Sequence, residues 1–468
     1  MTSFDDRASS EDYVDESRLV VHKENVDLDE HPGRLTTVLG RWIGYAAACR
    51  PGGPFRPGFW RSPLRGPWLT AVFSVVLLFG MTLMFLTGLA SYAAYDPNLA
   101  RVNDTTPDKG LLGSWLPTWP ASPSWLYWVT QGVHVTLGLV LIPIVLAKLW
   151  SVLPKLFEWP PARSLTQLVE RGSLLLLVGG AVFELVTGVM NIQYYYAWPF
   201  GFYQAHYYGA WVFIAAFVVH VAFRLGRLVT ALRSRSLTRE LRTPLSATRP
   251  EPPDPDHLVS PDPAPPTISR RGALGMVALS SLTLLGLSIG QTLGGPARST
   301  ALLAPRGLAL GSGPNDFPVN KTAAMAGITP VDDSWRLALH GPASRSLSRT
   351  ELLALPQHTA RLPIACVEGW STGEQTWTGV RLADLARLAG ASPGDELLVE
   401  SLQQGGFRAA TLSADQVHGP DALLALRVNG ADLSLDHGFP ARIAVPALPG
   451  VHNTKWVTRL TFQAGSAR

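Results

Sequence analysis

The sequence predicts a multi-domain protein with a bundle of four membrane-spanning helices, a fifth anchor helix and a separate α+β domain. Three observations lead to this fold class. Hydrophobic residues make up 47% of the 468 residues, charged ones only 16%, and the apolar residues cluster in long runs. A stretch rich in proline and aspartate interrupts the chain at 243–268. From 296 to 468, short β-rich runs alternate with turn signals.

Residues 1–66 precede the first apolar run. Residues 1 to about 40 are acidic and lack hydrophobic periodicity, which predicts a disordered tail. The rest of this segment is rich in Arg, Gly and Pro, as expected of a cytoplasmic juxtamembrane stretch. Arginines elsewhere lie beside apolar runs, where membrane topology explains them, so no nucleic-acid partner is expected. The two cysteines, Cys49 and Cys366, do not indicate a disulfide framework.

Four long apolar runs follow within residues 67–231. They lie at about 68–92, 125–147, 173–196 and 204–223, and each is long enough to cross a lipid bilayer. Arg and Lys are concentrated before the first run, between the second and third, and after the fourth. Because such residues mark the cytoplasmic side, both ends of this unit are expected in the cytoplasm.

Residues 232–268 predict a Pro-rich cytoplasmic linker, solvated and semi-extended by its prolines. Residues 269–295 follow, with Arg270 and Arg271 ahead of a weakly apolar run, which resembles a twin-arginine export signal of bacteria. An ordinary fifth span is the alternative. No small-x-small cleavage site follows, so we expect an anchor helix. Either interpretation places residues 296–468 outside the cytoplasmic membrane.

Three histidines lie inside the four runs: His134, His206 and His220. One such histidine is more often a packing residue, but three favour haem, because two neutral imidazoles are a common axial pair for b-type haem. At 1.5 Å per residue, His220 lies about 6 Å from the inner edge, His134 about 21 Å and His206 about 27 Å. His134 and His206 therefore predict one haem near the outer leaflet. Glu184, the single acid of the third run, is either functional or paired with a neighbouring helix.

The histidine spacing resembles the di-haem b-type cytochrome subunit of respiratory formate dehydrogenases and hydrogenases, over about residues 65–230. The resemblance implies an outer haem on His134 and His206. It implies an inner haem on His220 and a histidine at the start of the first span, where this chain has Pro67 and Trp68. A second haem iron at His220 therefore lacks its expected partner. Such a unit would exchange electrons with a quinone pool.

The outer segment contains two groups of candidate site residues. Cys366 ends an apolar, β-like run and is followed by Glu368 and a glycine. A core cysteine is the simpler alternative. Downstream, His437, Arg442 and Lys455 stand between apolar runs. Arg and Lys suit a buried anion such as phosphate, and the alternative is a strand–loop–strand with surface bases.

About residues 315–465 closely resemble the molybdopterin-binding domain of the sulfite oxidase family. The family form, His-Gly-x-Pro-x-Arg followed by Gly and Lys-Trp, matches His437 to Arg442, Gly450 and then Lys455 with Trp456. The resemblance implies that Cys366 binds molybdenum and that these basic residues bind the pterin.

It also implies that Asn320 approaches the active site. Thiolate suits molybdenum in its lower oxidation states. Glu368 could then shuttle the proton of an oxygen-atom transfer, or only hydrogen-bond to the site.

The pattern Cys-x-Glu-x-Trp-Ser resembles the periplasmic molybdenum reductases that repair methionine sulfoxide. Sulfite oxidases carry an arginine soon after the cysteine, where this chain has Ser371 and Thr372, although Arg408 could supply one from elsewhere. We therefore expect a membrane-bound oxidoreductase with a molybdenum–molybdopterin cofactor and haem b. It would pass electrons from a quinone pool to an oxidised small-molecule or protein substrate outside, such as a sulfoxide. The alternatives are a sulfite dehydrogenase on the same scaffold, and a haem-only electron carrier whose outer domain has lost its metal.

Overall fold

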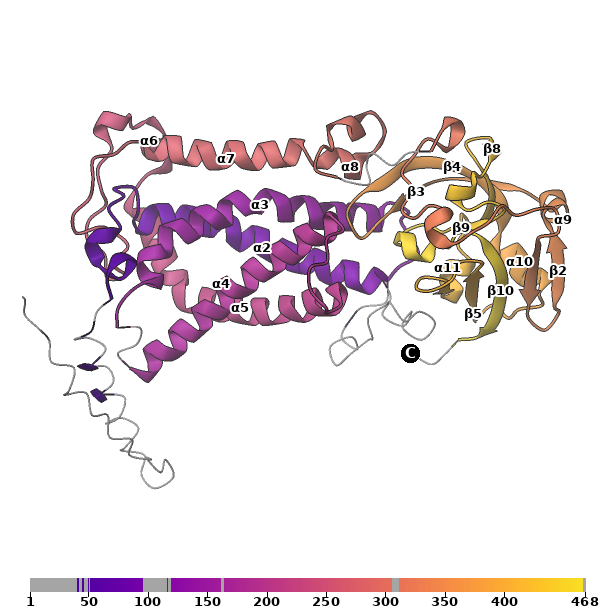
Figure 1. Cartoon of the computed structure of the whole chain (residues 1–468), viewed down its shortest axis with the longest axis horizontal. Coiled ribbons are helices and arrows are strands. Elements are labelled where there is room, and N and C mark those ends of the chain that lie inside the picture. Colours follow the sequence, from indigo (N-terminus) through magenta and orange to yellow (C-terminus); the bar gives the residue numbers. More distant parts are fainter. Residues whose placement is uncertain are drawn as a thin grey trace, which may run out of the picture.

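The computed structural model describes residues 40–41, 44–45, 49, 51–95, 116, 119–160, 164–304 and 311–465. A bundle of long helices and a β-rich domain lie end to end (Figure 1). The expected disordered tail, up to residue 39, lies outside the described residues, as does most of the loop after the first helix.

Five helices in the described part are long and apolar enough to cross a membrane by length and composition. The helices of this end of the molecule are α2 (Pro67–Tyr95), α3 (Leu126–Leu156), α4 (Leu165–Ile192), α5 (Phe202–Ser234), α6 (Leu237–Arg242), α7 (Arg270–Gly286) and α8 (Ile289–Leu293). Several run past the apolar runs predicted from the sequence. α5, for example, continues beyond Phe223 through three arginines, because Arg is a good helix former even where hydropathy is low.

The bundle is held by apolar packing between α2, α3, α4 and α5, with α7 alongside α3 (Figure 1). One cluster joins Met81, Leu141, Val145 and Phe213 from three of these helices. Ser281 of α7 donates to the carbonyl of Val140 at 2.8 Å, which fixes the anchor helix against α3. α4 and α5 leave large apolar side chains such as Leu175 and Phe223 exposed, as a lipid-facing surface would.

The linker after α5 contacts the bundle at several points, while half of residues 243–268 are exposed to solvent. Glu251 is 6% exposed, and its carboxylate accepts from the backbone N–H of Trp68 at 2.9 Å, at the start of α2. Asp256 forms ion pairs with Lys155 at 2.5 Å, Arg224 at 2.9 Å and Arg227 at 3.0 Å. Asp256 therefore neutralises basic side chains in the C-terminal halves of α3 and α5.

The β domain contains two five-stranded sheets in the described residues. The first has the order β2-β1-β10-β5-β6, with β1 and β10 parallel. The second has the order β3-β4-β7-β8, with β9 also paired to β7. The strands are β1 (Arg336–His340), β2 (Arg345–Ser348), β3 (His358–Ala365), β4 (Ser371–Arg381), β5 (Asp395–Ser401), β6 (Ala409–Leu412), β7 (Leu423–Val428), β8 (Ala431–Asp432), β9 (Arg442–Ala444) and β10 (Val457–Ala464).

Short helices complete this domain: α9 (Arg349–Ala354), α10 (Leu382–Leu388) and α11 (Ala414–Val417). The α+β character predicted from the sequence is confirmed. The larger core cluster combines side chains of both sheets with α10, among them Leu337, Leu385, Leu424 and Leu460. At the bundle end, Ala365 of β3 packs against Ala94 of α2 and Tyr127 of α3.

Candidate functional site

Cys366 begins a closed loop, residues 366–370, which we call the cysteine loop. The backbone N–H of Cys366 donates to the carbonyl of Trp370 at 2.9 Å, and that of Gly369 donates to the carbonyl of Cys366 at 3.0 Å. Gly369 has φ +87°, and a Cβ there would lie 2.7 Å from Val135 of α3. Only glycine satisfies both the backbone conformation and this close approach.

The surroundings of Cys366 suit a metal ligand better than a free nucleophile. The side chain is 8% exposed. Burial, and then the neighbouring Glu368 carboxylate, raise the pKa of the Cys366 thiol well above its usual range. Such a thiol stays protonated and unreactive on its own, whereas coordination to a metal deprotonates it outright. Glu368 is itself oriented by the indole N–H of Trp370, which donates to its carboxylate at 3.0 Å.

His437, Arg442 and Lys455 converge in one buried basic cluster, 2%, 6% and 9% exposed. Arg442 donates to the carbonyls of His437 and Asn453, each at 3.1 Å. Lys455 Nζ donates to the carbonyl of Asp436 at 2.8 Å. The alternative of surface bases is therefore wrong for these three residues.

The glycine of this motif has a geometric reason. Gly438 has φ +107°, and a Cβ there would lie 3.1 Å from the side chains of both Arg442 and Lys455. A side chain at 438 would be strained and would press the two cations apart. The glycine after His437 therefore allows the backbone bend that brings the three basic residues together.

Backbone contacts connect the basic cluster to the strand that precedes the cysteine loop. Ala365, just before Cys366, forms an isolated parallel bridge with Pro449. The carbonyl of Pro449 accepts from the Asn453 side chain at 3.2 Å, and the carbonyl of Asn453 accepts from Arg442. Segment 449–453 thus connects the cysteine to the cations.

Asn320 lies beside the same cluster. Its side-chain oxygen accepts from the backbone N–H of Lys321 at 2.9 Å. The carbonyl of Lys321 in turn accepts from Lys455 Nζ at 2.5 Å. The structure therefore places Asn320 next to the cluster of His437, Arg442 and Lys455.

The cluster fits a buried anion. Among the ion pairs of the described residues, none involves Arg442, and its three hydrogen bonds go to backbone carbonyls. Burial lowers the pKa of Arg442 to about 9, the cost of desolvating a guanidinium without a charged partner. Among the described residues, the buried hydroxyl of Thr454, next to Lys455, has no hydrogen-bond partner. A phosphate would accept from these groups and neutralise the charge.

His134 and His206 meet in a cavity inside the bundle, which we call the histidine cavity. Residues of α2, α3, α4 and α5 line this cavity. The ring centroids of His134 and His206 are 6.3 Å apart. Two imidazoles at this separation could both hold one metal-containing group such as a haem.

Each of these imidazoles has its Nδ1 engaged. His134 Nδ1 lies 3.0 Å from the carbonyl of Met84, and His206 Nδ1 lies 3.0 Å from the carboxylate of Glu184. This leaves Nε2 of each ring for a metal, the arrangement usual for metal-binding histidines. Glu184, whose role the sequence left open, is thus paired with a candidate ligand.

His220 lies in a different cavity near the inner end of the bundle, which we call the inner cavity. Lys148, Ser74, Arg224 and Asp256 line it as well. Among the described residues of this lining, His220 is the one histidine. The described lining therefore supplies one imidazole, and Pro67 and Trp68 stand at the start of α2.

Sequence reasoning missed two residues that support these sites. Gln131 and Gly88 line the histidine cavity, and a Cβ at Gly88 would lie 2.8 Å from the His134 ring. The signal for Gly88 was a small residue within the first apolar run, at a position that faces His134 in the structure. Gln131, one turn before His134 on α3, was visible as a polar residue in an apolar run.

The comparisons with known proteins fall on the outer domain. Residues 326–468 match the family model described as "Oxidoreductase molybdopterin binding domain". This part of the chain is a molybdopterin-binding oxidoreductase domain similar to those of sulfite oxidases. The buried cations and the cysteine loop lie within the matched residues.

Two curated relatives agree. The Bacillus subtilis protein named "Uncharacterized oxidoreductase YuiH" is 31% identical over 130 residues, 27% of this chain and 65% of that protein. The mitochondrial sulfite oxidase of Drosophila melanogaster is 31% identical over 176 residues, 31% of this chain and 30% of that protein. The chain thus spans less than two thirds of either relative.

A solved structure, the sulfane dehydrogenase SoxCD from Paracoccus pantotrophus, is 24% identical over 30% of this chain and 40% of that chain. Its TM-score is 0.27, too low to carry an argument about function.

Proposed function

We propose that this protein is a membrane-bound molybdenum oxidoreductase that carries its own haem relay and reduces an oxidised substrate such as a sulfoxide. The observation that supports this most directly is that the cysteine loop and the two histidines line one cavity. Val367, adjacent to Cys366, lines the same cavity as His134 and His206. The candidate molybdenum ligand and the candidate haem ligands are therefore neighbours, although 160 or more residues separate Cys366 from either histidine in the chain.

In this proposal the molybdenum–molybdopterin cofactor would supply oxygen-atom exchange coupled to two electrons. Cys366 would hold the metal, while Arg442, Lys455 and His437 would hold the anionic pterin side and Asn320 would lie beside it. The Trp370 indole orients the Glu368 carboxylate next to the cysteine, where it can deliver a proton to the departing oxygen.

His134 and His206 would hold one b-type haem, which accepts and releases single electrons. Met84 and Glu184 fix the two imidazoles through Nδ1. The haem would lie in the outer half of the bundle, next to the cysteine loop.

The inner cavity is where we place exchange with the quinone pool. Its walls are mostly apolar, and Lys148, Ser74 and His220 are polar groups within it that could hydrogen-bond to a quinone head. Oxidation of a quinol releases two electrons and two protons. Reduction of a sulfoxide consumes two electrons and two protons and yields a sulfide and water, so the two half-reactions balance.

Metal and haem analysis of the purified chain, followed by assays with methionine sulfoxide and with sulfite, tests this function. We expect one molybdenum and one haem b per chain, and quinol-dependent consumption of the sulfoxide. Cys366→Ser should abolish that consumption while keeping the haem spectrum. A chain with haem but without molybdenum, when produced in a host that makes the cofactor, would instead support the haem-only carrier.

A sulfite dehydrogenase is the second candidate, and one contact favours it. Arg298, in the η7 turn (Gly295–Thr300) after the anchor helix, donates to the carbonyl of Thr372 at 3.3 Å. Its Nε is buried without a partner. A guanidinium thus stands beside the strand where sulfite oxidases carry their arginine, whereas Arg408 is exposed.

Arg298→Gln separates the two candidates. If the substrate is sulfite, the variant should raise the KM for sulfite, because an anion-binding charge is lost. If the substrate is a sulfoxide, which carries no net charge at the sulfur group, its KM should stay the same.

A further inference from the structure

We propose that the cysteine loop is the electron-transfer face of the outer domain, and that Gln131 of α3 is the positioning residue that seats this loop over the histidine cavity. The inference rests on the proposed function, because it concerns the route between the two redox sites. It adds a surface and a residue that neither the family likeness nor the sequence assigns.

The first step is the contact that Gln131 makes across the junction. Its side-chain amide donates to the carbonyl of Val367, directly after Cys366. Its side-chain oxygen accepts from Ser91 of α2 at 2.5 Å. Gln131 is 4% exposed, so both groups need these partners. One buried amide therefore connects α2, α3 and the cysteine loop.

The second step is the position of Gln131 relative to the haem ligand. Gln131 precedes His134 by three residues on the same helix, a rise of about 4.5 Å. Both residues line the histidine cavity, and so does Val367. The hydrogen bond from Gln131 thus links the wall that holds His134 to the peptide segment that carries Cys366.

The third step is that the loop is fixed from several sides. Thr292 of α8 donates to the carbonyl of Gly369 at 2.7 Å, and Ser371 donates to the carbonyl of Thr292 at 2.8 Å. Trp370 donates to the hydroxyl of Tyr194, at the end of α4, at 3.3 Å. The anchor helix and the bundle therefore hold the same five-residue loop.

Docking also depends on close backbone packing. A Cβ at Gly369 would lie 2.7 Å from Val135, the residue after His134. Gly369 and the Val135 side chain are therefore in direct contact. Electrons would cross at this contact, one at a time, from the reduced haem site to the oxidised molybdenum site, with the quinol as the source of both electrons.

The test uses the full chain in lipid nanodiscs, with Gln131→Leu and Gly369→Ala as junction variants. Losing one buried hydrogen bond should increase local opening of residues 366–371 about tenfold, seen as faster amide hydrogen exchange in Gln131→Leu. Both variants should lose the fast phase of haem re-oxidation when methionine sulfoxide is added to the reduced protein. Haem and molybdenum contents are measured in every variant, and rates are compared per cofactor-loaded chain.

Gly430→Ala is the matched control. Gly430 has φ +83° in the turn between β7 and β8, and nothing lies within 4 Å of an added Cβ. It imposes the same backbone strain away from the junction and should leave both readouts unchanged.

The inference is overturned if both junction variants keep wild-type exchange and the fast phase. If wild-type haem is not re-oxidised by the sulfoxide at all, the proposed function fails. The exchange data then still decide whether Gln131 seats the loop.

Discussion

At the scale of single residues, His437 is a buried histidine whose surroundings favour the neutral imidazole. It is 2% exposed, and its ring centroid lies 3.9 Å from that of Phe317. Burial, and then the charge of Arg442, lower the pKa of His437 to about 4. The unfolded chain takes up a proton near pH 6.5, so between pH 6.5 and 4 the unfolded state binds more protons.

The first prediction follows from that difference. Stability of the cofactor-free protein should be lost as the pH falls from about 6.5 to 4, with His437 contributing on the order of 3 kcal/mol. His437→Gln should flatten this part of the pH profile, measured as the melting temperature of the full chain from a cofactor-deficient host. The exposed His418 offers a control, because His418→Gln should keep the wild-type slope. Equal slopes in all three proteins would contradict the buried neutral imidazole.

A second prediction concerns the membrane histidines. His134→Ala and His206→Ala should each abolish the b-type absorption band, because either change removes an axial ligand. His220→Ala should retain the band, because His220 lies in the inner cavity, apart from His134 and His206. It should raise the KM for quinol, because His220 is one of the polar groups proposed to hold the quinone head. Visible spectra of the purified variants measure this. Loss of the band only on His220→Ala would place the haem in the inner cavity instead.

At the scale of elements, the linker acts as a clamp on the inner end of the bundle. Ion pairs and hydrogen bonds to Lys155 and Arg224 hold the pKa of Asp256 well below its usual range, against the opposing effect of burial. These pairs join a segment after α5 to both α3 and α5. The proline and aspartate content predicted a solvated segment, since composition does not show which charges meet only after folding.

A third prediction tests the clamp. Asp256→Asn should leave three cations without their shared carboxylate and release residues 243–268, making them several times more sensitive to protease from the cytoplasmic side. Asp262→Asn is the control, because Asp262 and Arg61 form an exposed pair, 73% and 54% exposed, which should contribute little. If the two variants are cleaved at the same rate, the clamp has no measurable role.

At the scale of the whole molecule, the sequence predicted the parts better than their assembly. Apolar runs predicted the long helices, and the depth of His134 and His206 predicted that they lie close together. Motif spacing predicted Cys366, His437, Arg442 and Lys455 for one site. The docking of the cysteine loop on α3 could not be predicted from the sequence. Gly369 contacts Val135, and Gln131 bonds to Val367, only after folding brings together segments more than 200 residues apart.

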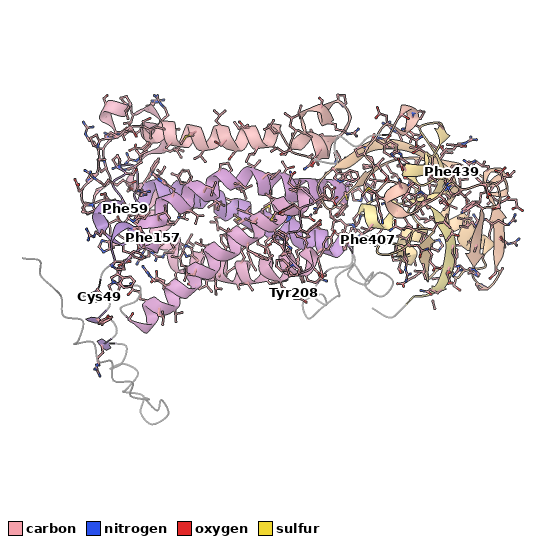
Figure 2. The ribbon with its side chains drawn as sticks, in the orientation of Figure 1. Cys49, Phe59, Phe157, Tyr208, Phe407 and Phe439 are labelled. Atoms are coloured by element: carbon pink, nitrogen blue, oxygen red, sulfur yellow. The ribbon has the colours of Figure 1, made fainter. Side chains whose placement is uncertain are left out.

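A fourth prediction concerns orientation in the membrane. Cys49 is exposed at the end of the molecule opposite the β domain (Figure 2), whereas Cys366 is buried. If the β domain lies outside, a membrane-impermeant maleimide should label Cys49 only after the cells are opened. Ser344→Cys, at an exposed position of the β domain, should be labelled in intact cells. Labelling of Cys49 in intact cells would reverse the proposed topology.

The central claim is that one chain carries electrons from the bundle to molybdenum at Cys366. The most direct measurement is the haem absorption of the purified, quinol-reduced protein after methionine sulfoxide is added without oxygen. The claim predicts re-oxidation of the haem, with two electrons consumed for each sulfide formed, and no re-oxidation in Cys366→Ser. Two results together would contradict the proposed direction of electron flow. The haem of the reduced protein would stay reduced when the sulfoxide is added, and the haem of the oxidised protein would become reduced when sulfite is added.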